Sequence, residues 1–171
     1  MPTFVLFVKA ELENVSEIVC PEGHAWCVDV KEAAGDEEKR GVWIDPNEST
    51  PLSGSRGEAN LVLKFPDSKK ESSATVVGLK AKKLTVPEQG AVYSAEAQET
   101  DKWQPLLAID CRGLEPIGWQ PRSGYTVVSE GGKRFEDIEI EDGAWCDYDD
   151  ENDLSVGVDE LEWEWRVHKG K

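Results

Sequence analysis

Hydrophobic and polar residues alternate along most of the chain, in stretches of strand length. In FVLFVKAEL, near the N-terminus, one face carries Phe4, Leu6, Val8, Ala10 and Leu12. Because successive side chains of a strand point to opposite faces, this period of two predicts a half-buried β-strand. The same pattern returns in AWCVDVK, GVWID, ANLVLKF, SATVVGLKA, QPLLAIDC, GYTVV, RFEDIEIE and LEWEWRVH. The pattern therefore predicts an all-β protein of about nine to eleven antiparallel strands.

Turn-forming residues separate these stretches, and helix signals are weak. Gly, Pro, Asn, Asp and Ser stand between the alternating segments, as expected of turns. The segment KEAAGDEEKR, residues 31–40, forms at most a short helical turn interrupted by Gly35. In the last stretch, Trp163 and Trp165 fall on one face, so alternation predicts that both are mostly buried.

The chain of 171 residues suits a single domain, 1–171. A faint duplication is visible, because KAEL at residues 9–12 and KAKKL at residues 80–84 each open a strand, with a loop and another alternating stretch behind it. This predicts two similar halves, 1–78 and 79–171. No linker of low complexity separates them, so the halves are expected to pack on each other.

The charge of the chain is strongly negative. There are 35 Asp and Glu residues against 19 Lys and Arg, a formal net charge of -16. This charge repels phosphate backbones and anionic lipid surfaces, so we expect neither a nucleic acid nor a membrane partner. Between Arg134 and Arg166 there is no Lys or Arg at all, while acidic residues are frequent. Such a run is ordinarily a solvated face, and a docking surface for a basic partner is the alternative.

The N-terminal sequence MPTFVLFVKAEL predicts a strand rather than a signal peptide. It lacks a basic segment, and its apolar run ends before Lys9. No stretch approaches the roughly 20 apolar residues that span a membrane. We therefore expect a soluble cytoplasmic protein, present as a monomer, whose cysteines are reduced.

A group of potential metal ligands lies in CPEGHAWC, residues 20–27. Zinc takes four ligands, which usually come as two spaced pairs, whereas Cys20, His24 and Cys27 form one irregular set with no second pair behind it. The ordinary interpretation is a Pro-Glu-Gly turn that enters a strand with small, buried thiols. A metal site in which these three residues recruit Cys111 stays open as the alternative.

Motifs for catalysis are missing from the sequence. It contains no nucleophile elbow, no Gly-rich phosphate loop followed by Lys-Ser/Thr and no HExxH pattern. Seven tryptophans are many for this length, and most are expected in the core. Trp119 and Trp145 stand next to Pro, Gly and acidic residues, so they are predicted to lie at the surface.

Two C-terminal stretches carry a more specific signal. They are CRGLEPIGWQPRSGY, residues 111–125, and FEDIEIEDGAWCDYDDENDLSVGVDELEWE, residues 135–164. Both resemble the eukaryotic CXXC motif containing zinc binding protein family, also described as domain of unknown function 866. KAELENV, residues 9–15, and SGSRGEANLVLK, residues 53–64, are similar to it as well. The resemblance covers nearly the whole chain and implies an antiparallel pseudo-barrel or sandwich of two similar halves.

The sequence departs from this family where the family holds zinc. Two Cys-x2-Cys pairs bind one zinc ion there, but the corresponding places are taken by Glu32 and Gly35 and by Phe65 and Ser68. The resemblance thus implies a degenerate site, with neither a bound metal nor another cofactor. Without zinc, the loops at residues 31–40 and 64–73 need another restraint to stay together.

The motif CRGLEP contains a pair of charged residues inside a turn. Arg112 and Glu115 flank Gly113 at the end of a predicted strand. Charged pairs in such turns more often fix the turn than contact a ligand, so both are predicted to be mainly structural.

Three functions from different classes follow. The first is an intracellular binding or adaptor protein, not an enzyme, that contacts a protein partner through its acidic face. Its candidate contact residues are Trp119, Trp145, Asp147, Tyr148, Asp149 and Asp150. The second is a metal-handling protein that binds zinc through Cys20, His24, Cys27 and Cys111. The third is an enzyme with a pocket between the two halves.

Overall fold

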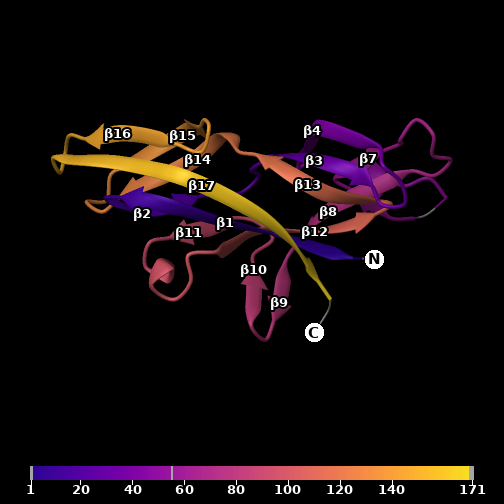
Figure 1. Ribbon diagram of the computed structural model, residues 1–171, viewed down its shortest axis with the longest axis horizontal. Coiled ribbons are helices and arrows are strands. Elements are labelled where there is room, and N and C mark those ends of the chain that lie inside the picture. The colour runs from indigo at the N-terminus through magenta and orange to yellow at the C-terminus, as the bar shows by residue number, and fades with distance from the viewer. Residues whose placement is uncertain (1, 55, 170–171) are drawn as a thin grey trace.

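The computed structural model describes residues 2–54 and 56–169, which fold almost entirely into antiparallel strands (Figure 1). The predicted all-β class is confirmed. The described residues form 17 strands, more than predicted, because several strands of only two or three residues lie in segments that alternation treats as loops. A single 3-10 turn, Ala97–Glu99, is the helical element of the described residues. None of the described helical segments has the length and apolar composition to cross a bilayer.

A six-stranded sheet forms the middle of the molecule, in the order β16-β17-β1-β12-β8-β7. Its strands are β1 (Thr3–Glu13), β7 (Leu61–Leu63), β8 (Ser72–Val77), β12 (Gln104–Arg112), β16 (Trp145–Asp149) and β17 (Leu154–His168). At its centre β1 pairs with β12, with Leu6 opposite Leu107. Both faces of β1 are covered here, because Val5 and Phe7 pack in a second, smaller apolar cluster with Val86 of the β9–β10 hairpin.

Two smaller sheets lie toward opposite ends of the elongated molecule (Figure 1). One contains β11 (Val92–Ser94), β2 (Val15–Val19), β14 (Arg122–Ser129) and β15 (Arg134–Ile140). The other contains β13 (Leu114–Gln120), β3 (Trp26–Glu32) and β4 (Glu38–Ile44). Two short hairpins complete the fold: β9 (Leu79–Ala81) with β10 (Leu84–Val86), and β5 (Thr50–Pro51) with β6 (Glu58–Ala59).

The strand order has a two-fold pattern. Exchanging β1 with β12, β17 with β8 and β16 with β7 reverses the six-stranded sheet onto itself. The same exchange carries β2-β14-β15 onto β13-β3-β4. The residue between β1 and β2 also matches the residue between β12 and β13, because Asn14 (φ 52°) and Gly113 (φ 77°) are both in the left-handed conformation. The predicted match of KAEL with KAKKL is wrong, since residues 80–84 belong to the β9–β10 hairpin and β12 is the counterpart of β1.

Two tryptophans differ from their predicted positions. Trp119 is only 4% exposed and packs edge-on against Tyr125, so its predicted surface position is wrong. A register shift between Pro116 and Gly118 accompanies this inward placement. Trp163 is 40% exposed, which contradicts its predicted burial, because it lines an open groove described below. Trp165 is half-buried and donates its indole N–H to the Gly118 carbonyl at 3.2 Å.

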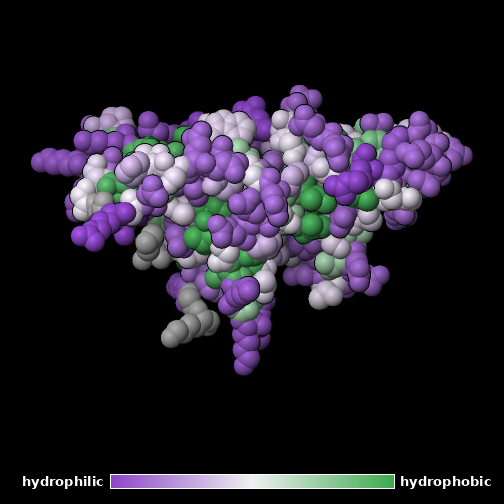
Figure 2. Space-filling model, turned by 180° about the vertical axis from the view of Figure 1, so that it is seen from behind, coloured by the Kyte–Doolittle hydropathy of each residue, from purple (hydrophilic) through white to green (hydrophobic). Residues whose placement is uncertain are grey.

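The apolar residues that remain at the surface do not form one continuous face. Seen from behind, hydrophilic residues dominate the molecule, and hydrophobic ones gather in separate patches near its middle (Figure 2). The large exposed hydrophobic side chains are Trp43, Val92, Tyr148, Trp163 and Val167. Trp163 and Val167 lie on β17, and the three others come from β4, β11 and β16.

Candidate functional site

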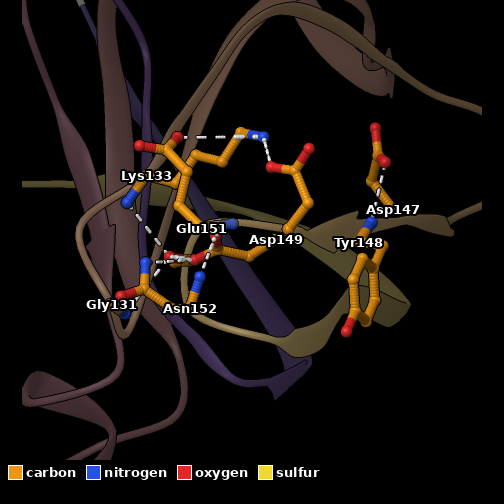
Figure 3. Close-up of polar contacts among 9 residues, drawn as sticks. Gly131, Lys133, Asp147, Tyr148, Asp149, Glu151 and Asn152 are labelled. Atoms are coloured by element: carbon orange, nitrogen blue, oxygen red, sulfur yellow. Dashed lines mark hydrogen bonds and ion pairs between the residues drawn. The ribbon is translucent and has the colours of Figure 1, made fainter.

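A buried carboxylate joins the β14–β15 loop to the β16–β17 loop (Figure 3). Asp149 has no exposed surface, and its Oδ2 accepts hydrogen bonds from Ser129 Oγ at 2.5 Å and Asn152 Nδ2 at 2.8 Å. Its Oδ1 accepts the backbone N–H groups of Glu151 and Asn152, each at 3.0 Å. Burial alone would raise the pKa of Asp149, but these donors outweigh it and lower that pKa below its ordinary value. The predicted contact residue Asp149 is therefore an internal anchor and not part of the surface.

The ammonium group of Lys133 pairs with two carboxylates beside this anchor. Lys133 Nζ lies 2.6 Å from Asp150 Oδ1 and 3.9 Å from Glu151 Oε2 (Figure 3). The hydrogen bond between Lys133 and Asp150 raises the pKa of Lys133 and lowers that of Asp150. In the described residues, Asp149, Asp150 and Glu151 are the one group of three potential metal-ligating side chains that lie close together. The cation that accompanies them is Lys133.

Strand β16 is an edge of the six-stranded sheet and carries three more of the predicted contact residues, Trp145, Asp147 and Tyr148. Trp145 is half-buried and packs edge-on against Phe135, with ring centroids 5.3 Å apart. Asp147 and Tyr148 are exposed, and the Asp147 carboxylate accepts the Tyr148 backbone N–H at 2.7 Å. Of the six predicted contact residues, Trp119 and Asp149 are thus inside, and the four others reach the surface wholly or in part.

An acidic groove of about 680 Å³ lies beside β16. Its lining includes Leu12, Ala144, Trp145, Cys146, Gly157 and Val158, together with the carboxylates of Glu11, Glu13, Glu141, Asp142 and Asp159, and contains no Lys or Arg. Sequence reasoning missed Glu11 and Glu13, which join the C-terminal acidic residues because β1 pairs with β17, with Glu11 opposite Asp159. The alternation of β1 contains a signal for them, since Glu11 and Glu13 lie on the opposite face of the strand from Leu12.

A second groove, of about 430 Å³, lies on the other side of the turn at residues 141–144. It is lined by the exposed Trp163, by Leu161 and by Glu139. Glu141 and Asp142 line both grooves, and the Leu161 N–H donates to the Gly143 carbonyl at 3.0 Å, which fixes the turn on β17. Arg122 also lines this second groove, so its charge is mixed, unlike that of the first groove.

The four places where the resemblance puts zinc ligands lie in two turns. Gly35 N–H donates to the Glu32 carbonyl at 3.3 Å, in the β3–β4 loop, so residues 31–40 form a hairpin and not a helical turn. Ser68 N–H donates to the Phe65 carbonyl at 2.9 Å, in the β7–β8 loop. The two loops meet where Asp67 lies beside Glu37. Burial, and then the adjacent Asp67 carboxylate, raise the pKa of Glu37.

The side chains in these turns do not fit zinc. Structural zinc takes four thiolate, imidazole or carboxylate ligands. Phe65 is fully buried in the main apolar core, and Gly35 has no side chain. The Glu32 carboxylate lies where a Cβ on Gly35 would stand, and the Ser68 hydroxyl donates to the Lys70 carbonyl at 3.1 Å. One carboxylate and one engaged hydroxyl cannot provide a tetrahedral zinc site.

The alternative metal ligands are not brought together either. Cys20, Cys27 and Cys111 are buried, and burial raises the pKa of Cys20 and of Cys111 to about 12. Burial lowers the pKa of His24 to about 4, against the opposite effect of a hydrogen bond with the Gly124 backbone. No three of these four residues form a potential metal-ligating group within the described part of the chain.

The charged turn of CRGLEP has a different partner from the predicted one. Glu115 pairs with Lys31, whose Nζ lies 3.1 Å from Glu115 Oε1, while Arg112 is exposed. The same Nζ donates to the Glu32 carbonyl at 3.1 Å and the Gly35 carbonyl at 3.3 Å. Lys31 therefore connects Glu115 to the first of the two turns.

Comparison with known proteins gives matches over nearly the whole chain. A family model described as "CXXC motif containing zinc binding protein, eukaryotic" matches residues 5–166. The rat CXXC motif containing zinc binding protein is 30% identical over 164 residues, which cover 94% of this chain and 96% of that protein. A UPF0587 protein of Caenorhabditis elegans is 28% identical over 165 residues, covering 94% of this chain and 92% of that protein. A solved structure, titled a hypothetical protein from Plasmodium falciparum, superposes with a TM-score of 0.81 at 26% identity, covering 97% of this chain and all (100%) of that chain.

Proposed function

The chain belongs to the eukaryotic CXXC motif containing zinc binding protein family, and we propose that it is a non-catalytic binding protein that docks a basic segment of a partner protein in the acidic groove beside β16. The family name records a motif and a ligand but no activity. The proposal therefore rests on the surface of this chain rather than on its relatives.

The composition of the acidic groove carries the proposal. Five carboxylates line it without a Lys or Arg, and four remain beside Glu11, which pairs with Lys102 at 3.0 Å; Leu12, Trp145 and Val158 provide apolar contact area. Lys and Arg side chains match such a lining, because their aliphatic stems pack on apolar groups and their charged ends reach carboxylates. Trp145 adds the attraction of an aromatic face for a cation. The formal net charge of -16 also favours the approach of a basic partner.

Hydrogen bonds at the loop end of the β16–β17 hairpin support binding by a surface that is already ordered. Asp149 anchors the β16–β17 loop through Ser129 and Asn152, and Lys133 joins the same loop through Asp150. A surface held in this way loses little conformational entropy when a partner binds. The exposed side chains of Asp147 and Tyr148 extend this ordered surface along the edge strand.

A synthetic peptide tests the proposal directly. We would measure the anisotropy of a labelled peptide of about twelve residues, rich in Lys and Arg with apolar residues between them, on the wild type and on Glu13→Gln/Asp142→Asn. Two weakened charge contacts should reduce affinity by roughly tenfold at moderate salt. The matched control is Glu48→Gln/Glu58→Gln, which removes two exposed charges at the β5–β6 hairpin, outside the groove lining.

The control separates a site from general attraction. The control variant should bind within about twofold of the wild type, since distant exposed charges are largely screened. Equal losses in both variants would show that the peptide responds only to net charge, and the groove would then not be the binding site. A peptide of the same length in which Glu and Asp replace Lys and Arg should not bind to any of the three proteins.

A further inference from the structure

The cysteines of this chain disagree with the motif in the family name. The chain contains Cys20, Cys27, Cys111 and Cys146, and none of these forms a Cys-x2-Cys pair. Three of them are buried and the fourth, Cys146, is exposed on β16. A zinc ion bound in the manner of the family name would thus need ligands that this sequence does not carry.

The backbone nevertheless keeps two turns with the spacing of such pairs. Glu32–Gly35 and Phe65–Ser68 each have two residues between their ends, and in each the last N–H donates to the first carbonyl. The proximity of Asp67 to Glu37 places the two loops side by side. Two adjacent loops thus each keep a turn of this spacing, while the side chains are different.

Other groups occupy the space and make the contacts at this junction. Phe65 is completely buried in the main core, so its ring replaces a ligand with apolar packing. The Glu32 carboxylate fills the space beside Gly35. Lys31 Nζ binds the carbonyls of Glu32 and Gly35 and the carboxylate of Glu115, which holds the first turn against β13.

The opposite end of the molecule gives an example of how protein groups can join a corresponding pair of loops. Under the two-fold exchange of strands, the β3–β4 and β7–β8 loops correspond to the β14–β15 and β16–β17 loops. The second pair is joined through the Ser129–Asp149 hydrogen bond and the Lys133–Asp150 ion pair (Figure 3).

We infer that the β3–β4 and β7–β8 loops of this chain form a metal-free junction, in which Phe65 packing and the Lys31 contacts take the place of the zinc in the family name. This inference does not depend on the acidic groove, which lies beside β16. A failure of peptide binding would leave it unaffected, and a bound zinc ion would leave the proposed function unaffected.

Metal analysis of the untagged protein tests this inference. The chain would be expressed in zinc-supplemented medium beside the rat CXXC motif containing zinc binding protein, and both would be analysed for zinc and melted with and without EDTA. Since metal bound to a folded site adds to folding stability, EDTA should leave the melting temperature within about 1 °C and zinc should stay below about 0.1 per chain. About one zinc per chain, with a melting temperature lowered by EDTA, would overturn the inference.

A restored site provides a second, independent measurement. The variant Glu32→Cys/Gly35→Cys/Phe65→Cys/Ser68→Cys should bind about one zinc per chain, and EDTA should then lower its melting temperature. If this variant folds, as judged by circular dichroism, yet binds no zinc, the two turns are not arranged as a ligand site and the inference fails. If it folds only with zinc, the dependence on metal itself supports the arrangement, and the wild-type measurement still decides whether the natural chain is metal-free.

Discussion

At opposite ends of the molecule, two pairs of loops are held together by different chemistry. We call the meeting of the β3–β4 and β7–β8 loops the Phe65 junction, and that of the β14–β15 and β16–β17 loops the Asp149 junction. A fully buried phenyl ring holds the first, and a fully buried carboxylate with four hydrogen bonds holds the second. Apolar packing is non-directional, whereas the carboxylate requires every donor in place.

The two junctions differ in how precisely they position their loops. Packing around Phe65 keeps loops near each other but sets few directions, and the polar groups of these loops lie near the surface. The Asp149 junction fixes the direction of the β16–β17 loop, whereas the acidic groove lies at the other end of this hairpin, at Trp145 and Val158. The directional bonds thus define one loop more strictly than apolar packing defines the other, and stability measurements test that contrast.

The largest effect is expected at the Phe65 junction. Phe65→Ala removes a fully buried ring and should cost about 3–5 kcal/mol of unfolding free energy. For a chain of this size, that corresponds to a fall of roughly 10 °C in melting temperature, measurable by calorimetry. Phe65→Leu, which keeps most of the volume, is the control and should cost less than about 1.5 kcal/mol. An alanine variant as stable as the wild type would mean that another restraint holds the loops.

A smaller effect is expected at the Asp149 junction. Asp149→Asn keeps the size but removes the charge and turns one acceptor into a donor that faces Ser129 and Asn152. The melting temperature should fall by roughly 5 °C, because buried donors lose their partner. Asp147→Asn, on the exposed part of the same strand, should change it by less than about 1 °C. If both variants melt alike, the Asp149 network contributes no special stability.

The fold class could be predicted from alternation, because a period of two is a local property of each strand. Alternation is wrong at Trp163, which lines an open groove, and the turn-like neighbours of Trp119 are misleading, because that residue is buried on β13 beside a register shift. The faint repeat was aligned with KAKKL, because a short sequence match carries no information on strand pairing. Only the sheet order shows that β12 is the counterpart of β1.

The sequence gives part of the composition of the proposed site but not its detail. The acidic run includes Glu141, Asp142 and Asp159 of the proposed groove, yet it does not distinguish the buried Asp149 from the exposed Asp147 and Asp150. The hydroxyl that donates to the buried Asp149 belongs to Ser129, which lies outside the acidic run. Glu11 and Glu13 reach the groove only through the pairing of β1 with β17, which is a long-range contact.

A pH-dependent effect of intermediate size is expected between the two junctions. His24 packs against Trp26 of β3 and Tyr125 of β14, the strands that lead to the two junctions. Burial lowers the pKa of His24 to about 4, below that of the unfolded chain, so the unfolded state binds the proton first as pH falls. This contribution to stability is fully present above about pH 6.5 and should decline by about 2 kcal/mol at pH 5.

Denaturation with urea at pH 7.5 and pH 5 checks this expectation. His24→Gln should lack this part of the pH dependence, so the difference between variant and wild type isolates it from the many carboxylates. The Asp149 junction should not contribute in this range, because the pKa of Asp149 is lowered and its charge persists at pH 5. If wild type and variant lose equal stability between the two pH values, His24 does not bind its proton preferentially in the unfolded state.

The smallest effect is expected at the polar side of the Phe65 junction. Lys31→Met keeps the aliphatic stem but removes the ammonium from two carbonyls and from Glu115. Because the Lys31 side chain is part-exposed, at 28%, its contacts compete with water, and the loss should be about 1 kcal/mol in urea denaturation. Lys69→Met, an exposed residue of the partner loop, should stay within about 0.5 kcal/mol of the wild type. A loss at Lys31 as large as that at Phe65 would show that polar contacts, and not apolar packing, hold this junction, which would remove the contrast with the Asp149 junction.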